Sequence, residues 1–108
     1  MNGTLETFAK LEALLEERKS ADPASSYVAK LYSKGSKKIA QKVGEEAVET
    51  AMAAAAGDDV ELVKESADLL FHLMILLKSR GLSLSNVAGE LARREGLSGL
   101  DEKAARSE

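Results

Sequence analysis

The chain has 108 residues and a formal net charge of −3, with 44% hydrophobic residues, 31% charged residues and no cysteine. These values fit a single domain of ordinary globular composition. The absence of cysteine excludes disulfides, thiol catalysis and thiolate metal sites, and the acidic balance argues against nucleic acid as a partner. Because aromatic residues make up only 4% of the chain, we expect a core of closely packed aliphatic helices.

The apolar segments are too short to span a membrane. The stretch from Leu69 to Leu77 has nine residues without a formal charge and no stretch is longer, whereas a spanning helix needs about 20. The first twenty residues differ from a secretory signal peptide because they carry four glutamates: Glu6, Glu12, Glu16 and Glu17. We therefore expect a cytoplasmic protein that does not associate with membranes.

Helical periodicity predicts five helices, over residues 4–19, 24–33, 37–56, 60–79 and 84–94. The expected N-caps include Thr4, Ser36, Asp58 or Asp59, and Ser83 or Ser85. Pro23 interrupts the chain before the second helix, and Gly57 and Gly81 follow the third and fourth helices. The predicted fold is all-α: one domain over residues 1–95, a small bundle of four to five helices. We expect the polar segment 96–108 to be a flexible tail.

The third predicted helix carries charged residues along one flank. At about 100° per residue, its core-facing apolar residues occupy a sector about 80° wide. Beside this sector lie Lys38, Lys42, Glu45, Glu46 and Glu49. Glu46 is the nearest of them to the apolar seam, so three carboxylates meet at the edge of the buried face.

The fourth predicted helix is almost entirely apolar from Leu69 to Leu77, so we expect nearly all of its circumference to be buried there. Its polar residues nevertheless share one strip about 60° wide, formed by Glu61, Glu65, Asp68, His72 and Ser79. The strip contains no lysine or arginine, and burial of uncompensated carboxylates would cost several kcal/mol. We therefore expect a cation between the third and fourth helices.

The two acidic patches are predicted to face each other. Glu49 and Glu65 each lie eight or nine residues from the turn near Gly57 and Asp58, about 12 to 14 Å along their helices. Oxygen ligands without thiols select hard cations, and Mg²⁺ is commonly held by a few carboxylates together with substrate phosphates. One or two Mg²⁺ ions are the predicted cofactor. The alternative, two solvated helix faces, is the commoner explanation for a single charged strip but not for two matched ones.

Three kinds of residue beside the acids have roles that the sequence leaves open. Lys38 and Lys42 are either phosphate ligands or surface charges. Tyr27 either contacts a nucleotide or packs the short second helix. His72, one turn beyond Asp68, is expected to hydrogen-bond a neighbouring carboxylate rather than bind metal.

Two segments together resemble the phosphoribosyl-ATP pyrophosphatase family: residues 35–49, GSKKIAQKVGEEAVE, and residues 65–73, ESADLLFHL. The wider pattern of Glu-Glu-x-x-Glu followed by Glu-x-x-Asp is similar to the all-α nucleoside triphosphate pyrophosphohydrolase superfamily, which includes MazG proteins and dimeric dUTPases. The chain departs from the family pattern at Val28 and Phe71, where threonine and tyrosine are common. Neither change affects the acids.

The resemblance implies Mg²⁺-dependent hydrolysis of phosphoribosyl-ATP to phosphoribosyl-AMP and pyrophosphate, the second step of histidine biosynthesis, by a MazG-like homodimer. The catalytic residues that it implies are Glu45, Glu46, Glu49, Glu65 and Asp68. All of these except Glu45 look like metal ligands. Glu45 stays open between a ligand, a residue that orients water, and a partner of Lys38 or Lys42. The implied substrate-binding residues are Lys38, Lys42 and Tyr27.

Two other functions remain alternatives. One is a MazG-type pyrophosphatase acting on ordinary or damaged nucleoside triphosphates. The other is a helical dimerisation module whose acids are structural or bind metal without turnover. The range of nucleotides from which pyrophosphate is released separates the three hypotheses.

Overall fold

A computed structural model describes residues 3–95, and every regular element in this range is helical. The elements are α1 (Thr4–Glu17), the 3₁₀ turn η1 (Arg18–Ser20), α2 (Tyr27–Lys34), α3 (Ser36–Ala55), α4 (Asp59–Ser79) and α5 (Leu84–Arg93). This confirms the predicted all-α bundle. The predicted tail, 96–108, lies outside the described residues. No helix within 3–95 combines the length and the apolar character that crossing a bilayer requires.

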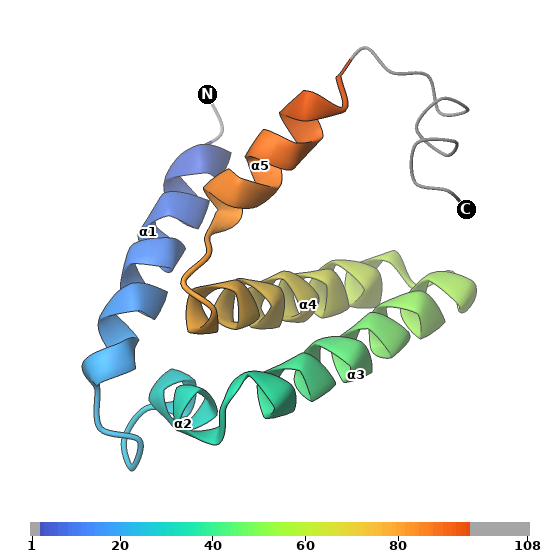
Figure 1. Cartoon of the computed structure of the whole chain (residues 1–108). Helices are drawn as coiled ribbons and strands as arrows, with labels where there is room; N and C mark the ends of the chain where they lie inside the picture. Colours follow the sequence, from blue (N-terminus) through green and yellow to red (C-terminus); the bar gives the residue numbers. More distant parts are fainter. Residues whose placement is uncertain (1–2, 96–108) are drawn as a thin grey trace.

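The α3–α4 hairpin is the centre of the fold, with α1 and α2 at one end of it (Figure 1). At the start of α5, the N–H of Leu84 donates to the Glu12 carboxylate on α1 at 2.8 Å. Gly57 closes the hairpin with a left-handed backbone, φ 73°, which side chains other than glycine rarely adopt. The N–H of Asp58 donates to the Ala53 carbonyl at 3.2 Å, as in a Schellman motif. The Asp58 carboxylate accepts the N–H of Glu61 at 3.0 Å, which confirms it as the N-cap of α4. The turn thereby fixes how α3 and α4 face each other.

The second helix begins at Tyr27, later than the predicted start at Ala24. The reason lies in two side chains that bond the backbone. Asp22 accepts the N–H of Ala24 at 3.0 Å and holds the segment after η1 as a turn. Ser26 then caps α2 by accepting the N–H of Ala29 at 3.1 Å.

Two predicted N-caps are also wrong. Gly3 and Gly35 occupy the cap positions of α1 and α3, so Thr4 and Ser36 are the first helical residues. The Ser36 hydroxyl instead hydrogen-bonds the Ser79 hydroxyl at 3.0 Å. This contact joins the start of α3 to the end of α4.

The buried core lies where α1 and α2 cover one end of the hairpin. Its members are aliphatic or methionine side chains from four helices: Leu15, Val28, Leu31, Ile39, Met74 and Ile75. Each fully buried side chain of this kind contributes about 1.5–3 kcal/mol. The Tyr32 hydroxyl donates to the Leu15 carbonyl at 2.9 Å and joins α2 to α1. The core therefore keeps one end of the α3–α4 hairpin rigid, and this end lies next to the predicted site.

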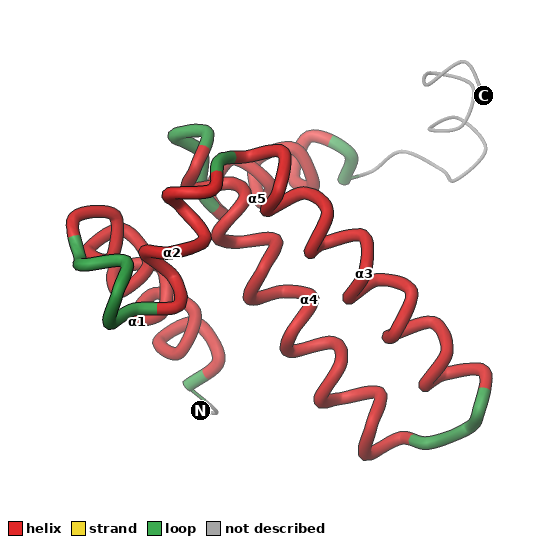
Figure 2. The backbone as a smooth tube through the Cα atoms, turned by 90° about the horizontal axis from the view of Figure 1, so that it is seen from below, coloured by secondary structure: helices red, strands yellow, loops and turns green. Residues whose placement is uncertain are grey.

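The other half of the hairpin projects beyond the remaining helices (Figures 1 and 2). Its apolar side chains are 59–70% exposed at Val48, Met52, Val60 and Val63. On α4, Leu70 is 40% exposed. Within 69–77, Leu70 is the one exposed side chain, and the other eight are buried or half-buried, so the prediction that α4 is buried around nearly its whole circumference there is confirmed except at Leu70.

Candidate active site

Three carboxylates meet between α3 and α4. One oxygen each from Glu46, Glu49 and Glu65 lies within 4.8 Å of the other two. Glu46 and Glu49 are almost one turn apart on α3, and Glu65 reaches them from α4. The structure thus brings together three of the four predicted metal ligands. Asp68, the fourth, is exposed and lies outside this group.

The acid cluster, Glu46, Glu49 and Glu65, is short of positive charge. Burial raises the pKa of Glu46, and a hydrogen bond and the charge from Glu49 raise it further, with a smaller contribution from Asp68. A hydrogen bond with Glu49, followed by burial, raises the pKa of Glu65 to about 7. The carboxylates therefore compete for a proton or a cation.

Two oxygen atoms of the acid cluster have no hydrogen-bond donor. Glu46 Oε2 and Glu65 Oε2 are buried without a partner among the described residues. Over the same residues, no lysine or arginine forms an ion pair with Glu49 or Glu65. Unpaired buried carboxylate oxygens are costly, and a hard divalent cation is the partner that an all-oxygen donor set prefers. The residues present therefore fit Mg²⁺.

Lys42 is the cation next to the acid cluster. Its Nζ lies 3.6 Å from Glu46 Oε1 and 3.7 Å from Glu45 Oε1. Burial lowers the pKa of Lys42, but the negative charges of the Glu46 and Glu45 carboxylates outweigh this effect, so its pKa is raised overall. Glu45 is exposed and also accepts a hydrogen bond from Gln41 Nε2 at 3.1 Å. Of the roles left open for Glu45, the structure shows the contact with Lys42.

Lys38 lies one turn before Lys42 and is exposed. Its Nζ donates to Gln41 Oε1 at 3.3 Å, and it forms no ion pair with an acid of residues 3–95. The ammonium group therefore stays available to a ligand in solution.

His72 is buried, 5% exposed, and holds Tyr27 next to the acids. Its Nδ1 bonds the backbone carbonyl of Asp68 at 2.8 Å, and because a carbonyl can only accept, Nδ1 carries a proton. In the neutral ring, Nε2 then accepts the Tyr27 hydroxyl at 2.8 Å. The expected hydrogen bond of His72 to a carboxylate is replaced by these two contacts. The Tyr27 side chain remains 52% exposed beside Lys42.

The Tyr27–His72 pair is the part of the site that the sequence did not predict. The two residues are 45 positions apart and lie on different helices. Each was a candidate by itself, but no spacing rule connects a short helix near the start of the chain with the middle of α4.

Comparisons with known proteins agree on one family. Residues 8–95 match the family model described as phosphoribosyl-ATP pyrophosphohydrolase. The chain is 60% identical over 104 residues to a phosphoribosyl-ATP pyrophosphatase of Erythrobacter litoralis, covering 96% of this chain and 100% of the relative. It is also 60% identical over 102 residues to the protein of that name from Novosphingobium aromaticivorans, covering 94% of this chain and 95% of the relative.

A longer relative matches through part of its length. The chain is 59% identical over 85 residues to the histidine biosynthesis bifunctional protein HisIE of Vibrio cholerae. The match covers 79% of this chain and 40% of that protein.

Proposed function

The chain belongs to the phosphoribosyl-ATP pyrophosphohydrolase family, and we propose that it hydrolyses phosphoribosyl-ATP to phosphoribosyl-AMP and pyrophosphate with Mg²⁺ as its cofactor. The observation that carries this proposal is the pair of buried, donor-free oxygens on Glu46 and Glu65. The names of the relatives support phosphoribosyl-ATP as the substrate. The name of the Vibrio cholerae relative also supports a role in histidine biosynthesis.

The acid cluster is the proposed cofactor site. Glu46, Glu49 and Glu65 would hold Mg²⁺, and Asp68 would complete the set from the next turn of α4. When bound, the ion supplies positive charge to phosphate oxygens and lowers the pKa of a water molecule. A single neighbouring lysine does not neutralise this many carboxylates, so the cluster favours a divalent cation.

The remaining residues of the site position the substrate. Cleavage of a phosphoanhydride depends on alignment and charge neutralisation more than on a protein nucleophile. Lys42, held by Glu45 and Glu46, is placed to bind a phosphate, and Lys38 extends this positive charge by one turn. The exposed Tyr27 ring offers a surface for the nucleotide. A carboxylate of the same cluster accepts the proton that the attacking water releases.

We infer that two copies of the chain pair through the uncovered side of the hairpin. A cavity of about 600 Å³ with an almost entirely apolar lining opens there, between α1 and α4, at Phe8, Leu11, Leu62, Val63 and Leu70. Contiguous exposed apolar surface of this kind marks an interface. Light scattering should show a dimer, and Val63→Glu should shift the mass towards the monomer. A monomeric parent protein would refute this pairing.

The cytoplasm is the location that we propose. The chain has no cysteine, which suits a reducing compartment. The proposed substrate is a nucleotide, and nucleotide metabolites are found in the cytoplasm.

Pyrophosphate release from phosphoribosyl-ATP and from a panel of nucleoside and deoxynucleoside triphosphates tests the function. Each reaction is run with Mg²⁺ and again with EDTA. We expect metal-dependent release from phosphoribosyl-ATP alone. Comparable turnover across the panel would instead indicate a MazG-type pyrophosphatase. Stabilisation by Mg²⁺ without hydrolysis of any nucleotide would indicate a non-catalytic module.

A further inference from the structure

A cavity of about 320 Å³ lies beside the proposed active site, where η1, the start of α2 and α4 meet. Its polar lining comes from Arg18, Ser25, Ser26 and Tyr27. We call this space the Arg18 cavity. Its volume lies at the lower end of the range for small-molecule sites, so it suits one phosphorylated sugar better than a whole nucleotide.

Arg18 gives this cavity a positive charge that the protein does not neutralise. The side chain is half-buried, and it forms no ion pair with an acid in the described part of the chain. Ser26 Oγ accepts the N–H of Ala29, which leaves the hydroxyl proton without an acceptor among residues 3–95. A planar guanidinium that donates two parallel hydrogen bonds, next to a hydroxyl donor, is a favourable arrangement for a phosphate group.

Two aromatic rings connect the Arg18 cavity with the acid cluster. Tyr27 and Phe71 both line the cavity, and both pack edge to face on the ring of His72, with centroids 5.9 and 5.3 Å away. His72 is in turn bonded to the Asp68 carbonyl. Tyr27 also lies near Lys42. A ligand that starts at Lys42 can therefore pass over Tyr27 and end at Arg18.

We propose that the Arg18 cavity binds the phosphate at the end of the phosphoribosyl arm, while the acid cluster and Lys42 bind the triphosphate. This inference rests on the proposed function, because the arm is what distinguishes phosphoribosyl-ATP from ATP and the deoxynucleotides. Those nucleotides carry the same triphosphate but no phosphate at a second end. Arg18 then determines specificity far from the bond that breaks.

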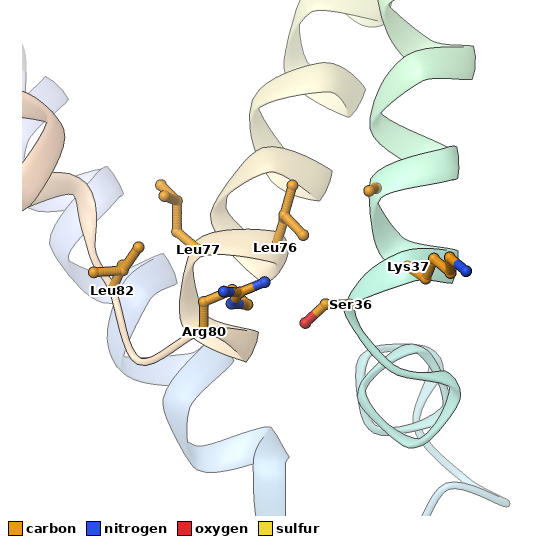
Figure 3. Close-up of a pocket in the computed structure, with 7 residues that line it drawn as sticks. Ser36, Lys37, Leu76, Leu77, Arg80 and Leu82 are labelled. Carbon is orange, nitrogen blue, oxygen red and sulfur yellow. The ribbon is translucent and has the colours of Figure 1, made fainter.

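A second cavity with positive charge, about 510 Å³, lies at the end of the hairpin between α3 and α4 and is lined by Ser36, Lys37 and Arg80 (Figure 3). It shares no lining residue with the acid cluster or with the Arg18 cavity. Lys37 lies nine residues before Glu46, which at about 100° per residue places it on the opposite side of α3. In Figure 3, Lys37 also points away from Arg80. Arg80→Ala is therefore a matched control for the loss of an arginine.

The kinetic test compares the parent protein with Arg18→Ala, Arg18→Lys and Arg80→Ala, using phosphoribosyl-ATP as the substrate and ATP as a competing ligand. We expect Arg18→Ala to lower kcat/KM for phosphoribosyl-ATP by about tenfold to a hundredfold, mainly through KM, because one charge-assisted contact is lost. Arg18→Lys should lose less, since it keeps the charge but not the two parallel hydrogen bonds. Arg80→Ala should match the parent, and Arg18→Ala should leave the inhibition constant of ATP unchanged.

A binding test keeps the proposal separate from the proposed function. Ribose 5-phosphate is titrated into the metal-free protein, and amide shifts are followed by NMR. We expect shifts at residues around Arg18, Ser26 and Tyr27, and we expect Arg18→Ala to abolish them. These shifts without any hydrolysis of phosphoribosyl-ATP would refute the proposed function but would support a phosphorylated-sugar site at Arg18.

Four results would overturn the assignment. If Arg18→Ala weakened inhibition by ATP as much as it lowered kcat/KM for phosphoribosyl-ATP, Arg18 would contact the triphosphate instead. A larger loss of kcat/KM in Arg80→Ala than in Arg18→Ala would place the phosphate of the arm in the cavity lined by Arg80. Binding of inorganic phosphate as tight as that of ribose 5-phosphate would show a site without selectivity for the arm. Unchanged kinetics in both Arg18 variants would show that the Arg18 cavity does not bind the phosphate of the arm.

Discussion

The carboxylate of Glu90 on α5 and that of Glu65 in the acid cluster have opposite surroundings. Glu90 accepts hydrogen bonds from the guanidinium groups of Arg93 at 2.6 Å and Arg94 at 3.0 Å, and these contacts lower its pKa to about 2. Glu65 faces the carboxylate of Glu49 instead, and this contact raises its pKa to about 7. The surroundings of Glu90 favour its charged form, whereas those of Glu65 favour its protonated form.

The difference separates an acid that the chain neutralises itself from acids that need a ligand. Glu90 has its countercharges three and four residues along the same exposed helix, as in an ordinary surface ion pair. The acid cluster lies at the edge of the buried core, and within residues 3–95 Lys42 is the one lysine or arginine that forms an ion pair with it. A bundle gains nothing in stability from such an arrangement, so its explanation lies in binding.

Substitution in the cluster should have the largest effect. Glu46→Gln removes the charge of a proposed metal ligand but keeps the shape of the side chain, so we expect turnover of phosphoribosyl-ATP to fall about a thousandfold or more. Asp68→Asn should act in the same direction. Pyrophosphate release measures the loss, and circular dichroism should show unchanged helix content. Glu90→Gln is the matched control and should keep full activity. Retained turnover in both cluster variants would place the active site elsewhere.

The stability of the metal-free protein should depend on the pKa of Glu65. That pKa is raised in the folded state from 4.5 to about 7, so the folded state binds the proton more tightly than the unfolded state. The resulting stabilisation is complete below about pH 4.5 and is lost as the pH rises through about 7. Urea unfolding in EDTA across this range should show the loss, and Mg²⁺ should restore stability at pH 8. The same pH dependence in Glu65→Gln would contradict the assignment.

The acid cluster could be predicted because it depends on local features of the chain. The periodicity of α3 and α4 identified the acidic strips, and the turn at Gly57 lies about equally far from Glu49 and Glu65. Equal distances along two antiparallel helices place the two carboxylates at one level. No knowledge of tertiary packing was needed for this step.

The missed features depend on packing between distant segments. The position of Tyr27 follows from how α2 docks on the hairpin, and the start of α2 depends on bonds from Asp22 and Ser26 that compete with a longer helix. The exposure of Leu70 shows a second cause. An apolar helix indicates that its surface will be covered, but its composition does not say whether the cover comes from the same chain.

Removal of the Tyr27 hydroxyl, which is uncharged, should have a smaller effect on activity than substitution in the acid cluster. Tyr27→Phe leaves the buried Nε2 of His72 without its donor, which should cost about 1–3 kcal/mol of unfolding free energy and raise KM severalfold. Tyr32→Phe is the matched control, because it also loses a hydroxyl hydrogen bond, to the Leu15 carbonyl in the core. It should lower stability without changing KM. Equal effects on KM in the two variants would show that Tyr27 has only a structural role.

The smallest effect is expected at the neutralised acid. Glu90→Gln removes two ion pairs on an exposed helix, and such solvent-exposed pairs contribute little to stability. The loss should be seen in urea unfolding at low ionic strength, and about 1 M salt should remove most of the difference by screening. The same salt should leave the defect of Glu46→Gln in place, because that carboxylate is buried and is proposed to act as a ligand rather than as a screened surface charge. A large loss of stability in Glu90→Gln that salt does not remove, or reduced turnover, would mean that the two groups of carboxylates differ less than their surroundings indicate.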